Sequence, residues 1–374
     1  MPDLRGMLHM HDVHGLGDGH GVCDGTAGTA RGRHPENEPM TEQDMRQERC
    51  PAGPAAVGLD LDLDSIAIGE TMALLVADQP GPLADVQHFT RRLAGADSNV
   101  AIGLARLGFQ VGWISRLGAD SLGAYVRRAI EAEGIDTSRV EIDAQRSTGL
   151  MLKSRTVDGS DPTIEYYRRG SAASLLGTAQ FDPAYLLRAR HLHATGITPA
   201  LSAAACDLVS RAMQLMRAHG RSVSFDPNLR PSLWPDAQTM RDTLNRLARD
   251  ADWVLPGLAE GRLLTGCDTP DAIAGFYLDQ GAQAVLVKLG ADGAYLRTAD
   301  GQVHSSPSVA VPVIVDTVGA GDAFAVGIVS ARLEGLAWPA ALARANWIAA
   351  QALQVVGDME GLPRRDQLPA LPGV

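Results

Sequence analysis

The strongest candidate for chemistry is a short run of small residues that ends in an acid. The apolar run 309–315, rich in β-branched residues, predicts a buried strand, and the apolar run 323–333 predicts a buried helix. Between them, Gly319 and Gly321 lack a Cβ, so an anion can approach the main chain closely. A strand, a glycine turn and a helix N-terminus together direct free backbone N–H groups at a phosphate. Asp322, where the helix begins, is then placed to accept a proton from a hydroxyl that attacks that phosphate.

An acid at the start of a helix also has a simpler explanation, because Asp is a common N-cap residue. Two other nucleotide-binding motifs are excluded. Phe324 stands where the dinucleotide fingerprint G-x-G-x-x-G requires a small residue, and G-x-x-x-x-G-K-[ST] does not occur in the sequence. The choice between a helix cap and a catalytic base therefore depends on the rest of the chain.

Composition narrows the class of protein. The 374 residues are 45% hydrophobic and 21% charged, as in ordinary globular proteins. A net charge of −11 disfavours nucleic acid and anionic membranes as partners. The four cysteines are scattered without a C-x-x-C, and no long apolar run or secretory leader is visible. We therefore expect a cytoplasmic protein with reduced thiols.

The first 58 residues differ in composition from the rest. They are rich in Gly, His, Asp and Pro, lack a helical or strand period, and hold five of the ten histidines. The histidines would suit a metal-binding tract. A disordered extension, or a start codon chosen too far upstream, is the interpretation we favour. We therefore expect the folded domain at residues 59–374.

Short apolar strands alternate with helical patterns through most of this domain. The pattern predicts strands at 65–69, 111–114, 191–194, 223–226, 253–255 and 284–288. It predicts helices that end before Gly108 and at 121–132, 201–219, 236–250 and 258–265. Such alternation is typical of an α/β fold with a mainly parallel sheet covered on both faces.

Other candidate strands do not fit this alternation. They lie at 73–76 and 86–91, and at 150–156 and 163–167. The second pair reads as a hairpin around Asp158-Gly159. We therefore expect a second, smaller sheet.

Two motifs resemble the signatures of the PfkB, or ribokinase-like, carbohydrate kinases. The run D-T-V-G-A-G-D-A-F at 316–324 is similar to the C-terminal signature, and A-G-A-D-S-N-V-A-I-G-L-A-R-L-G at 94–108 to the N-terminal one. Where the family usually has two glycines, this chain has Ala94 and Gly95. The resemblance implies a ribokinase-like αβα sandwich. Its small β-sheet lid would come from strands within about 73–91 and 148–169.

The resemblance covers residues 65–368 and is closest to the 2-keto-3-deoxygluconate kinase branch. The strings G-W-I-S-R-L-G, Y-Y-R-R-G-S-A-A-S, G-I-T-P-A-L, D-P-N-L-R and V-K-L-G-A-D-G-A carry it. It implies an enzyme that uses ATP and Mg²⁺ to phosphorylate a sugar acid, and it leaves a monovalent cation open as a further cofactor. Alternatives are a kinase of 5-keto-2-deoxygluconate, fructose or a nucleoside, or a non-catalytic sugar or nucleotide sensor. A homo-oligomer is expected.

The resemblance also implies roles for individual residues. Asp322 would be the catalytic base, and Gly319, Ala320 and Gly321 the anion hole. Substrate contacts would come from Gly95, Asn99, Tyr166, Tyr167, Arg168, Arg230, Asp322 and Asp358. Nucleotide contacts would come from Lys288, Leu289, Gly290, Ala291, Asp292, Gly293, Gly319, Ala320, Gly321 and Asn346.

One family feature is changed near the expected metal contact. Glu260 would reach Mg²⁺ through water, but the asparagine that the family has three residues earlier is Gly257 here. This departure removes the side chain that would contact the nucleotide or phosphate.

Several of these residues also have ordinary structural explanations. Arg230 follows a buried strand at its carboxyl end, where open α/β sheets bind ligands, and a guanidinium there can grip a carboxylate in two places. A surface salt bridge is the alternative. Alternation puts Tyr166 and Arg168 on one face of a strand, which would also suit a solvated edge. Asn99 would suit a helix cap, and Asn346 a local hydrogen bond in its helix.

Overall fold

The computed structural model describes residues 61–156 and 162–370. The chain divides into two units, residues 1–57 and 58–374, and every described residue belongs to the second. The expected N-terminal extension and the turn at Asp158-Gly159 lie outside the described residues. Within these ranges, no helix has the length and apolar character that a bilayer span requires.

A nine-stranded sheet forms the centre of the described unit, in the order β13-β12-β11-β10-β9-β8-β1-β4-β5. All pairs from β11 to β5 are parallel, whereas β12 and β13 add an antiparallel edge. This arrangement confirms the predicted α/β fold with a mainly parallel sheet. The strands are β1 Leu63–Ile68, β4 Val111–Gly118, β5 Asp136–Asp143, β8 Ala189–Thr195, β9 Ser222–Asp226, β10 Trp253–Val254, β11 Ala284–Lys288, β12 Ala294–Thr298 and β13 Val303–Ser306.

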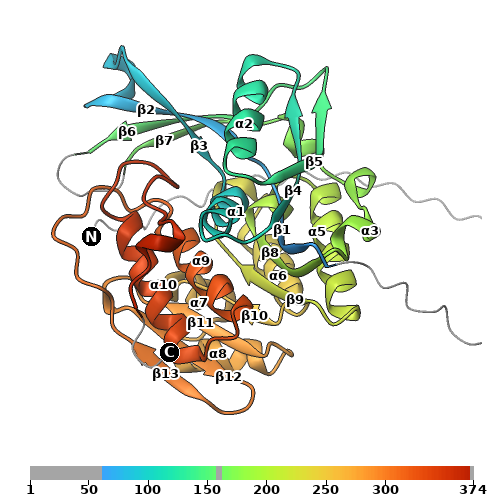
Figure 1. Cartoon of the computed structure of the whole chain (residues 1–374), viewed down its shortest axis with the longest axis vertical. Coiled ribbons are helices and arrows are strands. Elements are labelled where there is room, and N and C mark those ends of the chain that lie inside the picture. The colour runs from blue at the N-terminus through green and yellow to red at the C-terminus, as the bar shows by residue number, and fades with distance from the viewer. Residues whose placement is uncertain (1–60, 157–161, 371–374) are drawn as a thin grey trace, which may run out of the picture. The chain divides into compact units, whose positions relative to one another are not determined.

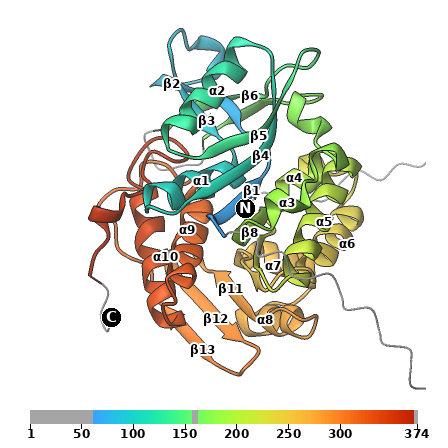
Figure 2. The ribbon, with the colours of Figure 1, turned by 45° about the vertical axis from the view of Figure 1, so that its right-hand side comes forward.

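Helices cover both faces of this sheet (Figure 1; Figure 2). One face packs against α1 (Ala96–Arg106), α2 (Ser121–Ala132), α9 (Ala320–Leu333) and α10 (Trp338–Ala352), whose apolar side chains share one core. The other face packs against α3 (Pro183–Leu186), α5 (Ala203–Ala218), α6 (Ala237–Ala248), α7 (Leu258–Thr265) and α8 (Pro270–Leu278). The short α4 (Ile197–Leu201) follows β8.

Helix α9 is largely buried, since residues 322–331 are all shielded from solvent. Gly327 allows α10 to pack closely on it, since a Cβ at this position would come within 2.3 Å of the Cα of Ala345. The helix that carries Asp322 is therefore fixed from several sides.

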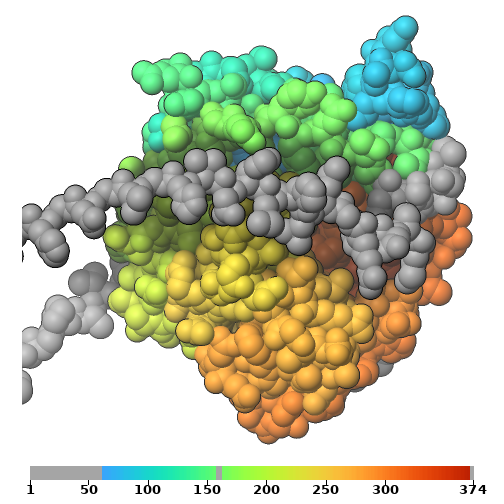
Figure 3. Space-filling view, turned by 180° about the vertical axis from the view of Figure 1, so that it is seen from behind, coloured from blue at the N-terminus to red at the C-terminus, as the bar shows by residue number. Residues whose placement is uncertain are grey.

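A second sheet has four strands in the order β3-β2-β6-β7. It confirms the predicted smaller sheet, and its buried side is formed by Met72, Leu74, Val76, Ala94 and Met151. The β2–β3 hairpin stands out from the rest of the described unit (Figure 3). The strands are β2 Met72–Pro80, β3 Phe89–Ala94, β6 Leu150–Arg155 and β7 Ile164–Tyr167.

The predicted buried strand at 309–315 was wrong. The chain has no regular structure there, and Val313 and Ile314 are 64% and 47% exposed. Pro312 lacks the N–H that a strand would donate to its neighbour. The apolar pattern also did not predict β5, α8, or the hairpin of β12 and β13 at the sheet edge.

Candidate active site

A cavity of about 420 Å³ is lined by residues of both sheets. Asn228 follows the carboxyl end of β9, and Lys288 ends β11. The strand order reverses at β1, because the chain continues from β1 to β4 on one side and returns to β8 on the other. Open α/β sheets usually bind ligands at the carboxyl edge beside such a reversal. The small sheet contributes Met72, Ala94, Met151, Ile164 and Tyr166.

The glycine turn at the start of α9 opens into this cavity. Gly319 has φ 84° and caps the helix, and a Cβ there would come within 2.2 Å of the carbonyl oxygen of Asp358. The Ala323 N–H donates to the Gly319 carbonyl at 2.8 Å, which closes the first turn of the helix. The N–H groups of residues 320–322 precede that bond and have no partner within the helix. They can therefore donate hydrogen bonds to an anion, and residues 319–322 are called the candidate anion-binding turn.

Asp322 is the third residue of α9 and is 8% exposed. The Asn99 amide donates to its Oδ2 at 2.8 Å, and the Asn228 amide donates to its Oδ1 at 3.2 Å. The helix itself has no side-chain cap, so capping does not explain this residue. Burial raises the pKa of Asp322 to about 7, against the opposing effect of the Asn99 hydrogen bond. A carboxylate with this pKa can accept a proton near neutral pH.

Two asparagines frame the carboxylate of Asp322. Asn228 has φ 38°, the one positive φ outside glycine among the described residues, a conformation that asparagine tolerates better than most residue types. Asn228 was not predicted as a site residue, although its motif D-P-N-L-R was noted. Asn99, which was predicted, is buried and its Oδ1 has no hydrogen-bond partner in the described chain. That buried oxygen is therefore left as an unpaired acceptor beside Asp322.

The two predicted arginines differ in their partners. Arg168 is buried, and its guanidinium contacts the Glu70 carboxylate at 2.5 Å. Arg230 lines the cavity and donates to its neighbour's carbonyl, that of Leu229, at 2.8 Å. Within residues 61–156 and 162–370 it makes no ion pair with a carboxylate, although its charge opposes the burial that raises the pKa of Asp322. The positive charge of Arg230 is therefore available to a bound anion.

Alternation along β7 separates the two tyrosines. Tyr166 and Arg168 both line the cavity, with the guanidinium 5.8 Å from the ring centroid. Tyr167 points elsewhere, because it is 57% exposed and its hydroxyl donates to Glu165 at 2.9 Å. The structure therefore brings two of these three predicted residues to the cavity.

Glu260 is held by main-chain groups on both carboxylate oxygens. The N–H groups of Gly257 and Leu229 each donate to it at 2.7 Å. Gly257 therefore still orients the acid through its backbone, although the side chain that the family has here is missing. The described residues hold no group of three or more potential metal ligands. One fixed carboxylate suits Mg²⁺ that keeps its waters and binds nucleotide phosphates, so the residues present fit this ion.

Of the predicted nucleotide loop at residues 288–293, only Lys288 lines the cavity. Its ammonium lies 2.6 Å from Asp226. Burial alone would lower the pKa of Lys288, but Asp226 and Glu260 outweigh it and raise that pKa. Residues 290–292 then form a short 3-10 turn before Gly293.

Asn346 joins this loop to the next. Its amide donates to the carbonyls of Ser306 and Pro307 at 3.1 and 2.9 Å, not to its own helix. A Cβ at Gly293 would come within 2.1 Å of the same Ser306 carbonyl oxygen. Residues 289–293 and Asn346 are thus brought together by residues 306–307.

Gly95 and Asp358, both predicted from the resemblance, line the cavity. A Cβ at Gly95 would come within 2.4 Å of the Glu70 carbonyl oxygen, which explains the need for glycine. Asp358 accepts a hydrogen bond from Lys153 at 2.9 Å. Sequence reasoning did not identify Lys153 or Glu70, because a single charged residue in or beside a strand gives no signal of its partner.

Comparisons with known proteins show the family to which the chain belongs. Residues 62–365 match the model of the pfkB family carbohydrate kinases. The chain is 50% identical to the 2-dehydro-3-deoxygluconokinase of Bacillus subtilis (strain 168) over 309 residues, 82% of this chain and 95% of that protein. It is 34% identical to the 2-dehydro-3-deoxygluconokinase of Thermoproteus tenax over 325 residues, 85% of this chain and 96% of that protein.

Solved structures show the same fold. A PfkB protein from Polaromonas sp. JS666 has a TM-score of 0.75 and 55% identity, covering 82% of this chain and 99% of its own. An aminoimidazole riboside kinase from Salmonella enterica, solved with aminoimidazole riboside and an ATP analogue, has a TM-score of 0.70 and 26% identity, covering 82% and 98%. The chain belongs to the pfkB family of carbohydrate kinases, with a ribokinase-like fold.

Proposed function

We propose that this kinase transfers the γ-phosphoryl group of ATP to the 6-hydroxyl of 2-keto-3-deoxygluconate, also called 2-dehydro-3-deoxygluconate. The observation that carries the proposal is Arg230, a cation without a carboxylate partner among the described residues, in the same cavity as Asp322. The names of the two curated relatives support the same substrate.

The charges around the cavity favour a sugar acid over a neutral sugar. Glu70 already neutralises Arg168, so that arginine keeps its buried position without a ligand. Arg230 has no such partner, and a guanidinium binds a carboxylate through two parallel hydrogen bonds. A neutral sugar offers no group that would match this charge. We therefore assign the substrate carboxylate to Arg230, with Tyr166 lining the same cavity.

The residues account for an in-line phosphoryl transfer. The 6-hydroxyl oxygen forms a bond to the γ-phosphorus, the bond from that phosphorus to the β–γ bridging oxygen breaks, and ADP leaves. Asp322 orients the hydroxyl and takes its proton, held by the amides of Asn99 and Asn228. The N–H groups of residues 320–322 face the charge that grows on the phosphoryl oxygens. The transition state is loose, so alignment and charge neutralisation contribute more than basicity.

The nucleotide side follows from the same cavity. Glu260 would hold Mg²⁺ through water, and the ion, when bound, would neutralise charge on the transferred phosphoryl group. The small sheet covers the sugar side through Met72, Met151 and Tyr166. Exclusion of water by this sheet would suppress hydrolysis of ATP. We assign the nucleotide to the loop at residues 288–293 and to Asn346.

The test is ADP release over a panel of 2-keto-3-deoxygluconate, 5-keto-2-deoxygluconate, fructose and a nucleoside. We expect the highest kcat/KM with 2-keto-3-deoxygluconate, and mass spectrometry with phosphorus NMR should place the phosphate on the 6-oxygen. A higher kcat/KM with fructose or a nucleoside would contradict the carboxylate assignment. Binding of sugar and ATP without phosphorylated product would instead indicate a sensor.

A further inference from the structure

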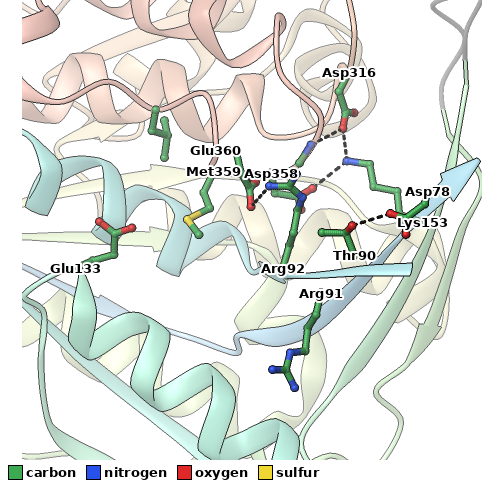
Figure 4. Close-up of polar contacts among 12 residues, drawn as sticks. Asp78, Thr90, Arg91, Arg92, Glu133, Lys153, Asp316, Asp358, Met359 and Glu360 are labelled. Carbon is green, nitrogen blue, oxygen red and sulfur yellow. Dashed lines mark hydrogen bonds and ion pairs between the residues drawn. The ribbon is translucent and has the colours of Figure 1, made fainter. Parts of the chain in front are cut away.

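A lysine of the small sheet lies at the centre of a buried ion cluster. Lys153, on β6, is 1% exposed, and its ammonium lies 2.6 Å from Asp316 and 2.9 Å from Asp358 (Figure 4). The carboxylates are almost as buried, at 4% and 7% exposed. Lys153 does not line the 420 Å³ cavity, whereas Asp358 does. The ammonium therefore lies outside the cavity, in contact with an acid that lines it.

Asp316 connects the anion-binding turn to the segment at residues 357–358. Its Oδ1 accepts the Val318 N–H at 3.1 Å, just before the turn, and its Oδ2 accepts the Gly357 N–H at 3.0 Å. The carbonyl oxygen of the next residue, Asp358, lies so close to Gly319 that a Cβ there would come within 2.2 Å of it. The position of the turn thus depends on where the residue 357–358 segment lies.

The ammonium lies within ion-pair distance of both carboxylates and offsets their mutual repulsion. Two buried carboxylates that approach the same point repel each other unless a cation lies between them. Burial raises the pKa of Asp358 even with Lys153 present to lower it. Loss of the ammonium would favour uptake of a proton by Asp358, or movement of residues 357–358 away from Asp316.

A second ion pair joins the small sheet to the same segment. Arg92 on β3 contacts Glu360 at 2.9 Å, and their side chains are 28% and 17% exposed (Figure 4). This pair holds the small sheet nearby but touches neither Asp316 nor Asp358. It lies against Gly357, so its loss removes a contact between the sheet and this segment while the Lys153 cluster stays in place.

We propose that Lys153 is a positioning residue for phosphoryl transfer: a cation built into the small sheet that fixes the anion-binding turn through Asp316 and the sugar-facing acid Asp358. The inference rests on the proposed kinase function. It goes beyond it, because it makes the small sheet part of the device that sets the geometry of the anion hole. It also implies that this point needs no cation from solution.

The experiment removes the ammonium and then supplies one from solution. Lys153→Ala should lose about a hundredfold in kcat and raise the KM for the sugar, while the KM for ATP changes by less than about threefold. Methylammonium should restore at least about tenfold of the lost kcat, since it can occupy the vacated volume, whereas tetramethylammonium is too large. Lys153→Met, which fills that volume without a charge, should show the same loss and no response to methylammonium.

Matched controls remove a charge from the same sheet. Arg155→Met changes an exposed arginine on β6, and Arg92→Met breaks the pair with Glu360. Arg155→Met should keep kcat within about twofold, Arg92→Met should lose less than Lys153→Met, and neither should respond to methylammonium. If Lys153→Ala is poorly folded, Lys153→Arg carries the test, because it keeps the charge and should retain more than about a tenth of the wild-type kcat.

Several outcomes would overturn the proposal. They are a folded Lys153→Met with wild-type kcat and sugar KM, an equal loss in Arg92→Met, or a Lys153→Ala variant whose activity does not respond to methylammonium. All assays use whichever sugar of the panel the wild type phosphorylates. A wrong substrate assignment would therefore appear in the wild type and a wrong role for Lys153 only in the variants.

Discussion

Two buried aspartates line the same cavity in opposite electrostatic settings. Asp358, after α10, has the ammonium of Lys153 at 2.9 Å. Asp322, in the first turn of α9, accepts hydrogen bonds from the neutral amides of Asn99 and Asn228. The charge of Arg230 opposes the effect of burial on the pKa of Asp322 but forms no ion pair with it among the described residues. Burial raises the pKa of both, and for Asp322 to about 7. The acid without a cation in direct contact is thus suited to take a proton, and the acid with one is suited to hold its place.

Removing the charge of Asp322 should have the largest effect on activity of the changes considered. Asp322→Asn should lose about a hundredfold or more in kcat with little change in either KM, because proton transfer is lost and binding is kept. The new amide can be accommodated, since Asn99 has a free Oδ1 that can turn toward it. Steady-state kinetics with circular dichroism measures this. Turnover near that of the wild type in a folded variant would refute the assignment.

The same variant should reveal the cost of burying the acid. The pKa of Asp322 rises from 3.8 in the unfolded chain to about 7 in the fold, so this group favours folding least above pH 7. The melting temperature of Asp322→Asn should therefore rise relative to wild type as the pH increases from about 4 to about 7. Thermal melts across this range provide the measurement, and a pH-independent difference would contradict the raised pKa.

The next effect concerns binding of the substrate rather than proton transfer. Arg230→Leu should raise the KM for the sugar acid by about tenfold to a hundredfold, the value of a charge-assisted hydrogen-bonded pair. The KM for ATP should change little. Arg169→Leu is the control, because Arg169 is exposed and does not line the cavity. Equal KM values for wild type and Arg230→Leu would exclude a carboxylate contact at this residue.

A smaller effect is expected at Glu260, which is proposed to act through water. Glu260→Gln should raise the Mg²⁺ concentration needed for half-maximal activity by about tenfold, because one negative charge near the ion is lost. Its Gln amide would also face the N–H of Gly257 or Leu229, so a modest drop in melting temperature should accompany it. A Mg²⁺ titration that matches wild type would remove Glu260 from the metal site.

The sequence predicted the parts of this site that lie within one contiguous motif. The turn at Gly319 and the acid at Asp322 could be predicted because glycines and an acid at a helix start have few alternative uses. The main sheet could be predicted because buried parallel strands are short and apolar. Apolar pattern was misleading at 309–315, where Pro312 prevents pairing and the side chains remain exposed.

Partners distant in sequence could not be predicted. Lys153 and Asp358 are 205 positions apart, and Glu70 and Arg168 are 98 apart, so only the fold shows that they meet. The same limit applied to Asn346, for which a local helix bond was weighed, although its amide binds a loop 39 positions away. Residue type predicted which groups could carry charge, and tertiary structure decided which of those charges are compensated.

The most direct test of the central claim is the pH dependence of kcat/KM for the sugar. The account predicts that wild-type kcat/KM rises with pH through a single limb with a midpoint near 7, because Asp322 must lose its proton before it can accept one from the hydroxyl. The limb should disappear from the residual activity of Asp322→Asn and persist in Asp358→Asn. A profile that is flat from about pH 5.5 to about pH 8 in the wild type, or a limb that vanishes in Asp358→Asn instead, would contradict the account.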